Sequence, residues 1–217
     1  IRNTPHQVLV FDKLTYAGTL TSLEPVSGDA RYQFVQADIC DAEAVAKVMR
    51  DFDPDIVAHL AAESHVDRSI HGPGDFIKTN VLGTFNLLEA VRAYWTELPE
   101  NEQQAFRFLH VSTDEVYGTV DKDPFTETTR YNPRNPYSAS KASSDQFVMA
   151  YHNTYGLPAI VTNCSNNYGP NQHDEKFIPT VIKKVLNGEK IPVYGNGSNV
   201  RDWLYVMDHV NAIDKIF

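Results

Sequence analysis

Residues 32–61 read YQFVQADICDAEAVAKVMRDFDPDIVAHLA, and this stretch decides the fold. It begins with an apolar run at 32–37, continues through 41–50 with apolar side chains at helical spacing, and ends in a second apolar run at 56–61. A strand, a helix and a strand in this order predict a parallel β-α-β unit. Continuous apolar runs are typical of parallel strands that are covered on both faces, so the strand at 56–61 is expected to be buried.

The same alternation continues on both sides of this unit. It predicts strands at 7–11, 107–112 and 159–163, and helices at about 75–95, 137–155 and 177–186. We therefore expect an α/β protein with a Rossmann-type, doubly wound parallel sheet. Because Pro, Gly and Asn become frequent after Asn167, residues 1–167 are expected to form this sheet domain. Residues 168–217 are expected to form a second, smaller region.

Composition narrows the possible partners. The chain has 217 residues, enough for one large domain or one and a half, and a net charge of -9. An acidic chain is a poor match for nucleic acid or for an anionic membrane surface, and no run of 18 apolar residues predicts a membrane span. Cys40 and Cys164 lie far apart and in no CxxC pair, which favours a reducing compartment and hence the cytoplasm.

No metal site is predicted from the histidines. His59, His65 and His71 are six residues apart, which matches neither helical ligands nor a zinc spacing. His59 lies inside a predicted strand and is interpreted as a core residue.

Polar residues follow every predicted strand. Ligands of parallel sheets bind at this place, beyond the carboxyl ends of the strands. These exits are Asp12-Lys13-Leu14-Thr15, Asp38-Ile39, Ala61-Ala62-Glu63-Ser64, Thr113-Asp114-Glu115 and Ser165-Asn166-Asn167. An acid such as Asp12 can bind a ribose 2′-OH and so favours NAD, although a simple turn residue is an equal alternative. The G-x-G-x-x-G turn that accompanies such an acid is absent, and Gly195 and Gly197 are interpreted as a turn.

Tyr137 and Lys141 form a Tyr-x-x-x-Lys pair on one face of a predicted helix. A nearby ammonium lowers the pKa of a tyrosine and makes it a usable general base near neutral pH. This pattern alone is common on surface helices. A strand that ends in Ser112-Thr113 some 25 residues upstream makes a catalytic role the better interpretation, because a hydroxyl there can bind the same substrate oxygen.

Thr113-Asp114-Glu115 is the most discriminating feature. Neighbouring carboxyl groups separate their pKa values, so that one can act as an acid while the other acts as a base. Beside an oxidising tyrosine, such a pair suits the elimination of water next to a transient ketone; a solvated loop pair is the alternative. Arg201, before Trp203, is a candidate for binding a phosphate, or a surface arginine stacked on the ring.

Six segments together resemble the extended short-chain dehydrogenase/reductase superfamily and, within it, the dTDP-glucose 4,6-dehydratase family. They are DKLTYAG at 12–18, LAAESHVDRS at 60–69, STDEVYG at 112–118, PYSASKA at 136–142, NCSNNYGP at 163–170 and RDWLYV at 201–206. They span nearly the whole chain in order. By this resemblance, the family's first strand, its glycine-rich turn and the C-terminal part of its substrate domain are missing from the 217 residues. Residues 1–167 would be the NAD-binding Rossmann domain, and residues 168–217 would begin a smaller, truncated substrate-binding region, with some of the chain returning to the Rossmann domain.

The resemblance implies NAD as cofactor, dTDP-glucose as substrate and loss of water to a 4-keto-6-deoxy sugar. The implied catalytic residues are Thr113, Asp114, Glu115, Tyr137 and Lys141. The implied NAD-binding residues are Asp12, Lys13, Leu14, Thr15, Asp38, Ile39, Leu60, Ala61, Ala62, Glu63, Ser64, Thr79, Tyr137, Lys141 and Asn167. The implied substrate-binding residues are Ser64, Thr113, Asn166, Lys176, Phe177, Pro192, Val193, Tyr194 and Arg201.

Family resemblance also implies a homodimer through the two long helices near 75–95 and 140–155, with Leu87 and Tyr151 as candidate contacts. Two other functions remain open. A nucleotide-sugar 4-epimerase of the UDP-galactose 4-epimerase type needs Tyr137 and Lys141 but not the acid pair. A non-catalytic NAD-binding regulator has no need to keep these four residues together.

Overall fold

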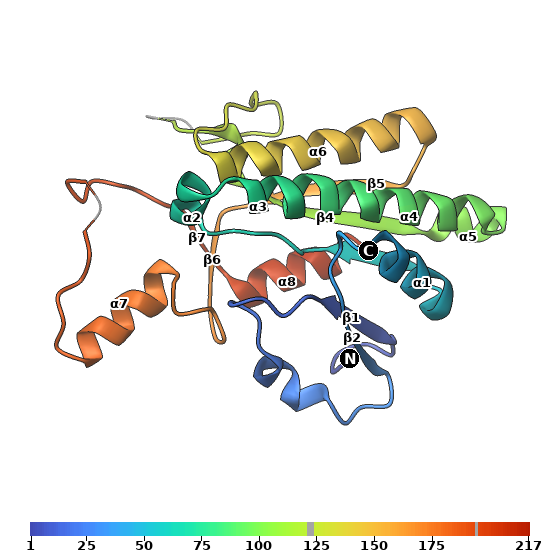
Figure 1. Ribbon diagram of the computed structural model, residues 1–217, viewed down its shortest axis with the longest axis horizontal. Coiled ribbons are helices and arrows are strands. Elements are labelled where there is room, and N and C mark those ends of the chain that lie inside the picture. The colour runs from blue at the N-terminus through green and yellow to red at the C-terminus, as the bar shows by residue number, and fades with distance from the viewer. Residues whose placement is uncertain (121–123, 194) are drawn as a thin grey trace. The chain divides into compact units, whose positions relative to one another are not determined.

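The computed structural model describes residues 1–120, 124–193 and 195–217. Residues Ile1–Asn163 and Cys164–Phe217 form two compact units, coloured blue to yellow and orange to red in Figure 1.

The first unit contains parallel strands of an α/β fold, as predicted. β1 (Val8–Asp12) pairs with β2 (Tyr32–Gln36), and β3 (Ile56–His59), β4 (Arg107–Thr113) and β5 (Ala159–Cys164) form a second sheet in that order. β1 and β2 are parallel, as are β3 and β4, and His59 lies opposite His110. In the doubly wound order 3-2-1-4-5-6, β2 and β1 match positions 3 and 2, and β3, β4 and β5 match positions 4, 5 and 6.

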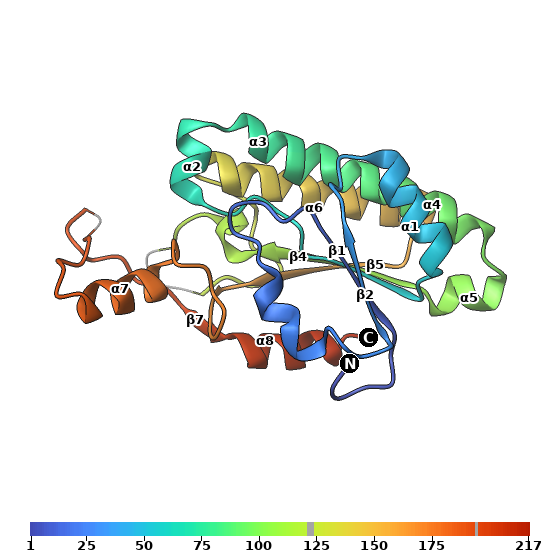
Figure 2. The ribbon, with the colours of Figure 1, turned by 60° about the horizontal axis from the view of Figure 1, so that its bottom comes forward.

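Helices connect and cover these strands. They are α1 (Ala42–Phe52), α2 (Val66–His71), α3 (Gly74–Phe76), α4 (Thr84–Glu97), α5 (Glu100–Ala105) and α6 (Pro136–Tyr155). A π-helical segment, Ile77–Gly83, joins α3 to α4, and short 3-10 helices cover Leu20–Val26 and Asp114–Tyr117. Figures 1 and 2 show α4 and α6 side by side, with α6 packed along β4.

The ends of α6 follow from its sequence. The Asn135 side chain accepts from the backbone N–H of Ser138 at 2.8 Å, and the Ser138 hydroxyl accepts from the N–H of Asn135 at 3.1 Å. This capping box satisfies two helix-end donors, and Pro136 is favoured in the first turn. Gly156 ends the helix with φ +77°, a left-handed conformation that suits glycine. The catalytic candidates Tyr137 and Lys141 therefore lie in the first turns of a well-defined helix.

The hydrophobic core lies between the sheet and the helices α1, α4 and α6. Its fully buried members include Leu88, Val91, Phe106, Phe108, Val148 and Leu157. Leu87 and Tyr151 also belong to this core, so the prediction that they face a partner chain is wrong. Helical spacing gave the correct helices but could not show which side of each one meets the sheet.

β3 differs from its prediction as a buried strand over 56–61. It ends at His59, and Ile56 and Leu60 are 38 % and 59 % exposed. Within the described chain β3 pairs with β4 on one side, so its other edge lacks the neighbour that would cover it. His59 is buried, and its interpretation as a core histidine is confirmed.

The second unit contains two short parallel strands and two helices. β6 (Asn166–Tyr168) pairs with β7 (Trp203–Tyr205), and α7 (Phe177–Leu186) and α8 (Val206–Asp214) complete it. The Phe177 ring stacks on Trp203 with 6.0 Å between the ring centroids. Across the ranges 1–120, 124–193 and 195–217, no helix combines the length and the apolar character needed to span a membrane.

Candidate active site

The exit of β4 carries the Thr-Asp-Glu sequence on a tight turn. Thr113 caps the 3-10 helix Asp114–Tyr117: its hydroxyl oxygen accepts from the N–H of Glu115 at 3.3 Å and lies 3.3 Å from a carboxylate oxygen of Asp114. Gly118 ends this turn with φ +89°, and a β-carbon there would collide with the carbonyl oxygen of Asn132. The turn thus presents two adjacent carboxylates beside a threonine hydroxyl at the carboxyl end of a buried strand.

Glu115 is connected to the start of α6. Asn135, the capping residue of that helix, donates from Nδ2 to Oε2 of Glu115 at 3.3 Å. Asn163 at the end of the unit donates to the carbonyl of Thr113 at 3.2 Å and accepts from the Tyr117 hydroxyl. These contacts hold the acid pair close to the helix that bears Tyr137.

Tyr137 and Lys141 lie on α6, four residues apart, and both are nearly buried. The Tyr137 ring meets Phe76 edge-on at 6.3 Å between centroids. Lys141 Nζ donates to the carbonyl of Val111 at 2.9 Å. This bond holds the ammonium against β4, two residues before Thr113. The structure therefore brings the tyrosine, the lysine and the Thr-Asp-Glu turn to one end of the β4–α6 pair.

Asn80 is a site-organising residue that the sequence predictions missed. It is buried in the π-helical segment, accepts from the N–H of Glu63 at 2.8 Å, and donates to the Glu63 carbonyl at 2.9 Å. Its amide also donates to the Ser140 hydroxyl at 2.8 Å, and that hydroxyl donates to the carbonyl of Tyr137. Asn80 thus joins the loop after β3 to α6, the helix that carries Tyr137 and Lys141. The local sequence Lys78-Thr79-Asn80-Val81 offers no signal for this role, because its partners Glu63 and Ser140 are 17 and 60 residues away.

The exits of β1 and β2 present the residues predicted to bind NAD. Asp12 Oδ1 accepts from the N–H of Leu14 at 2.7 Å, and Leu14 has φ +53°, so the chain turns sharply there. Lys13 forms an ion pair with Asp38 at 2.7 Å. Burial raises the pKa of Asp38, but the Lys13 ammonium and the Cys40 N–H outweigh it and hold that pKa below its usual value.

This edge fits a dinucleotide. Asp12 forms the last pair of the β1–β2 ladder with Gln36, so its carboxylate lies at the carboxyl end of the strand, where the fold class binds a ribose hydroxyl. The remaining predicted cofactor residues of the first unit lie in three nearby segments of chain: Ile39 after β2, Leu60, Ala61, Ala62, Glu63 and Ser64 after β3, and Thr79 in the π-helical segment.

The other predicted binding residues lie in the second unit. Asn166 and Asn167 are on β6, Lys176 and Phe177 begin α7, and Pro192, Val193 and Arg201 lie in the segment between α7 and β7. Tyr194 lies outside the described residues. Within this unit Asn167 Oδ1 lies 2.9 Å from Nδ1 of His209. Arg201 is exposed, and its guanidinium donates to the carbonyl of Val200.

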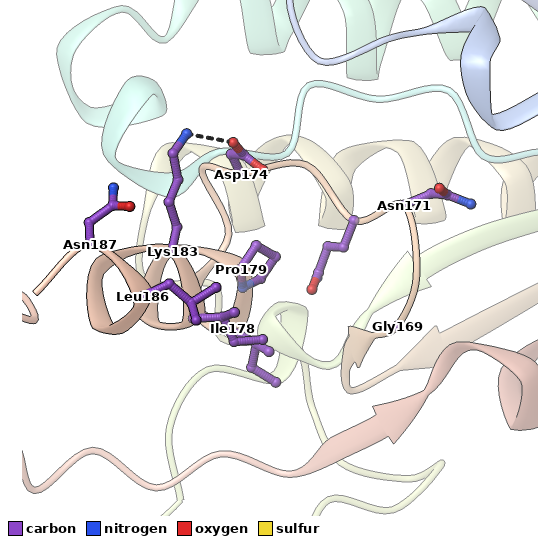
Figure 3. Close-up of a pocket in the computed structure, with 10 residues that line it drawn as sticks. Gly169, Asn171, Asp174, Ile178, Pro179, Lys183, Leu186 and Asn187 are labelled. Atoms are coloured by element: carbon purple, nitrogen blue, oxygen red, sulfur yellow. Dashed lines mark hydrogen bonds and ion pairs between the residues drawn. The ribbon is translucent and has the colours of Figure 1, made fainter.

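A pocket of about 420 Å³ lies beside α7 in the second unit. Figure 3 shows its rim, where Lys183 pairs with Asp174 at 2.8 Å, and its apolar wall of Ile178, Pro179 and Leu186. The predicted residues Lys176 and Phe177 do not line it. It is therefore distinct from the set of side chains predicted to bind substrate.

The parallel strands, their helices and the polar strand exits define a Rossmann-type α/β protein. Comparison with known proteins places it more narrowly. The family model described as GDP-mannose 4,6 dehydratase matches residues 2–217, and the chain belongs to that family. The chain is 57 % identical to a dTDP-glucose 4,6-dehydratase of Neisseria meningitidis serogroup B over all of its length.

The chain is also similar to solved structures of enzymes that act on nucleotide sugars. The dTDP-glucose 4,6-dehydratase DesIV of Streptomyces venezuelae, crystallised with NAD, is 46 % identical and superposes on 97 % of this chain with a TM-score of 0.89. A UDP-glucose 4-epimerase of Thermotoga maritima, 30 % identical, superposes on 96 % with a TM-score of 0.84. Dehydratases and epimerases thus share this fold, so the fold alone does not separate them.

The chain spans about three fifths of these relatives: 61 % of the Neisseria protein, 62 % of the Streptomyces structure and 64 % of the Thermotoga structure. The activity of the whole protein is therefore a proposal.

Proposed function

We propose that this chain is part of an NAD-dependent hydro-lyase, a dTDP-glucose 4,6-dehydratase. One observation carries the proposal: the turn Thr113-Asp114-Glu115 at the exit of β4, with Glu115 hydrogen-bonded to the cap of the helix that bears Tyr137 and Lys141. The identity to proteins named dTDP-glucose 4,6-dehydratase supports the choice of substrate.

In this proposal NAD supplies the hydride chemistry: when bound, it accepts a hydride from C4 of the glucose ring and returns it to C6. The residues proposed to hold NAD are those at the exits of β1, β2 and β3, together with Thr79, Tyr137, Lys141 and Asn167. Asp12 would bind a ribose hydroxyl, which favours NAD over its 2′-phosphorylated form.

Each catalytic side chain has one task. Tyr137 accepts the proton of the sugar 4-OH, and the ammonium of Lys141 favours the ionised phenol. Thr113 donates a hydrogen bond to the oxygen at C4, which becomes a carbonyl. That carbonyl acidifies the proton at C5, which Glu115 removes.

Water leaves in the same elimination. Asp114 protonates the 6-OH, the C6–O bond breaks, and a C5–C6 double bond forms conjugated with the ketone. When C6 regains a hydride, C5 regains a proton, and the product is dTDP-4-keto-6-deoxyglucose. The atoms balance as substrate minus one water. This division of labour needs two carboxyl groups in different protonation states, which the adjacent Asp114 and Glu115 can supply.

The second unit would bind the nucleotide part of the substrate. We assign this role to Asn166, Lys176, Phe177, Pro192, Val193, Tyr194 and Arg201, with Arg201 on the diphosphate. Ser64 and Thr113 would contact the sugar. In this division residues 1–167 serve the cofactor, and residues 168–217 begin the substrate-binding region.

We also propose a homodimer in the cytoplasm. Apolar side chains remain exposed along the helical pair α4–α6, including Phe85, Phe147, Met149 and Tyr155. Phe85 and Phe147 pack edge-on across the two helices with 6.5 Å between ring centroids, so they form one surface. An apolar surface of this kind is typical of a protein interface. Two cysteines outside any CxxC pair suit a reducing compartment.

The deciding experiment is the mass of the product. The protein expressed from its complete gene is incubated with NAD and dTDP-glucose, and with UDP-glucose in a parallel reaction. We expect a product lighter by one water from dTDP-glucose. A product of unchanged mass would identify an epimerase instead, and no product from either sugar would favour a non-catalytic NAD-binding protein.

A further inference from the structure

Asp145 is a fully buried carboxylate to which the proposed reaction gives no task. It lies on α6, four residues after Lys141, and is 0 % exposed. Its Oδ2 accepts from the Ser112 hydroxyl at 2.8 Å and from the Tyr131 hydroxyl at 2.9 Å. Its Oδ1 lies 3.1 Å from Nε2 of His110. Burying a carboxylate is costly, and the hydrogen bonds from the two hydroxyl groups offset part of that cost.

The three partners come from the segments that build the catalytic site. Ser112 directly precedes Thr113 at the exit of β4, and His110 lies two residues earlier on the same strand. Tyr131 belongs to the segment that leads to Asn135, the cap that holds Glu115. One carboxylate on α6 therefore fixes both neighbouring segments against the helix of Tyr137 and Lys141.

A second set of contacts links Asp145 to Lys141. The ammonium of Lys141 lies 3.5 Å from Nε2 of His110, the same nitrogen that lies 3.1 Å from Oδ1 of Asp145. Burial lowers the pKa of His110, although Asp145 opposes this shift, so the imidazole is neutral near pH 7. Lys141 and Asp145 thus both approach one nitrogen of the same neutral ring.

The histidine and tyrosine side chains around His110 and Asp145 are neutral near pH 7, whereas the acids Asp114 and Glu115 follow Thr113 on the next turn. The His59 ring of β3 is tilted by 42° against the His110 ring, with 5.0 Å between their centroids, and burial lowers the pKa of His59 well below the usual value. Burial raises the pKa values of Tyr131 and of Tyr117, and the charge of Asp145 raises them further. The charge of Asp145 consequently acts on Lys141 with little compensation from these neighbours.

We propose that Asp145 is a positioning residue of the active site: it fixes the exit of β4 against α6 and supplies the buried negative charge that balances the ammonium of Lys141. It acts through Ser112, Tyr131 and His110 and touches no reacting atom. The proposal rests on the proposed function, because it assigns a task within the same site.

Asp145→Asn tests the charge with little change of shape. The amide oxygen can still accept from Ser112 and Tyr131, and its NH2 group can donate to His110 in the other tautomer. Loss of a negative charge makes neighbouring groups release their protons more readily. We expect a lower kcat and a pH–rate profile in which both limbs move to lower pH by about 0.5–1 unit. A profile that keeps its midpoints would overturn the electrostatic part of the proposal.

Tyr131→Phe is the matched variant, because it removes one hydrogen bond and leaves the charge. We expect a several-fold loss of kcat with KM and both midpoints unchanged. If Asp145→Asn does not fold, Tyr131→Phe and Ser112→Ala carry the test of positioning. Wild-type kcat in both would overturn it.

A measurement without substrate separates this proposal from the proposed function. The tyrosinate absorbance of Tyr137 is obtained against pH as the difference between the protein and its Tyr137→Phe variant, each with and without Asp145→Asn. We expect the midpoint to fall in Asp145→Asn. That fall in a protein that does not convert dTDP-glucose would support the task of Asp145 and reject the proposed function. Normal dehydration of dTDP-glucose with an unchanged Tyr137 midpoint would support the proposed function and reject the task of Asp145.

Discussion

β3 and β4 are neighbours in one sheet, yet their side chains are buried to different extents. Phe108 and Leu109 of β4 are fully buried, whereas Ile56 of β3 is 38 % exposed. β4 pairs on both sides, and β3 pairs with β4 alone among the described strands. The exit of the buried strand carries the acid pair, and the exit of the open strand carries residues proposed to contact NAD. Burial of a parallel strand therefore depends on its neighbours as much as on its own apolar sequence.

The largest expected effect is at the exit of β4. Glu115→Gln keeps a hydrogen-bonding partner for Asn135 but removes the proposed base at C5. We expect dehydration of dTDP-glucose to fall by about 10²–10⁴-fold, the range typical of a lost general base. Oxidation at C4, followed through reduced NAD absorbance, should persist. Dehydration at the wild-type rate would show that Glu115 is not the base.

The next effect contrasts the two strands directly. Phe108→Ala should lower the free energy of unfolding by about 3–5 kcal/mol, because it leaves a cavity in a closed core. Ile56→Ala in the 217-residue chain should cost about 1 kcal/mol or less, because its side chain is partly in water. Both are measured by urea denaturation.

The variants Phe108→Ala and Ile56→Ala can also be compared in the protein expressed from the complete gene. If a first strand pairs with the open edge of β3, the cost of Ile56→Ala should rise toward about 2–4 kcal/mol. A cost at Phe108 as small as that at Ile56 would contradict the difference in packing.

A smaller effect concerns the two histidines that face each other across β3 and β4. Burial lowers the pKa values of His59 and His110 in the folded chain. As the pH falls below about 6.5, the unfolded chain binds protons that the folded chain does not, so stability is lost. The slope should reach about 1.4 kcal/mol per pH unit for each histidine.

Urea denaturation at pH 7.5, 6.5 and 5.5 measures this slope. His59→Gln should reduce it, and His6→Gln, at an exposed position, should leave it unchanged. An equal slope in the His59 variant would exclude His59 as its source.

The smallest effect is at the cap of α6. Asn135→Ala removes the side-chain half of the capping box and the bond to Glu115. We expect a loss of about 1 kcal/mol in unfolding free energy. Asn135→Ser should restore most of that stability, because serine also caps helices, but not the contact with Glu115. If activity returns together with stability, the contact with Glu115 is not needed.

Part of the site could be predicted from local sequence. The Thr113-Asp114-Glu115 exit and the Tyr137–Lys141 spacing depend on the end of one strand and on one helical turn. Other parts could not be predicted this way. Asn80 contacts Ser140 across 60 residues, and Asp145 contacts Ser112 across 33, so nothing local distinguishes them from other polar residues in helices. Leu87 and Tyr151 show the same limit, because periodicity does not say which partner a helix face will meet.

The sequence by itself determined the order of strands and helices and which chemical groups follow each strand, because periodicity and capping are local. The tertiary structure alone decided how deeply each group is buried and what it faces. It placed Asp145 and Lys141 at one nitrogen of His110, and among the described strands it paired β3 with β4 alone. The electrostatic environment of a side chain depends on contacts between distant segments, and those contacts exist only in the folded chain.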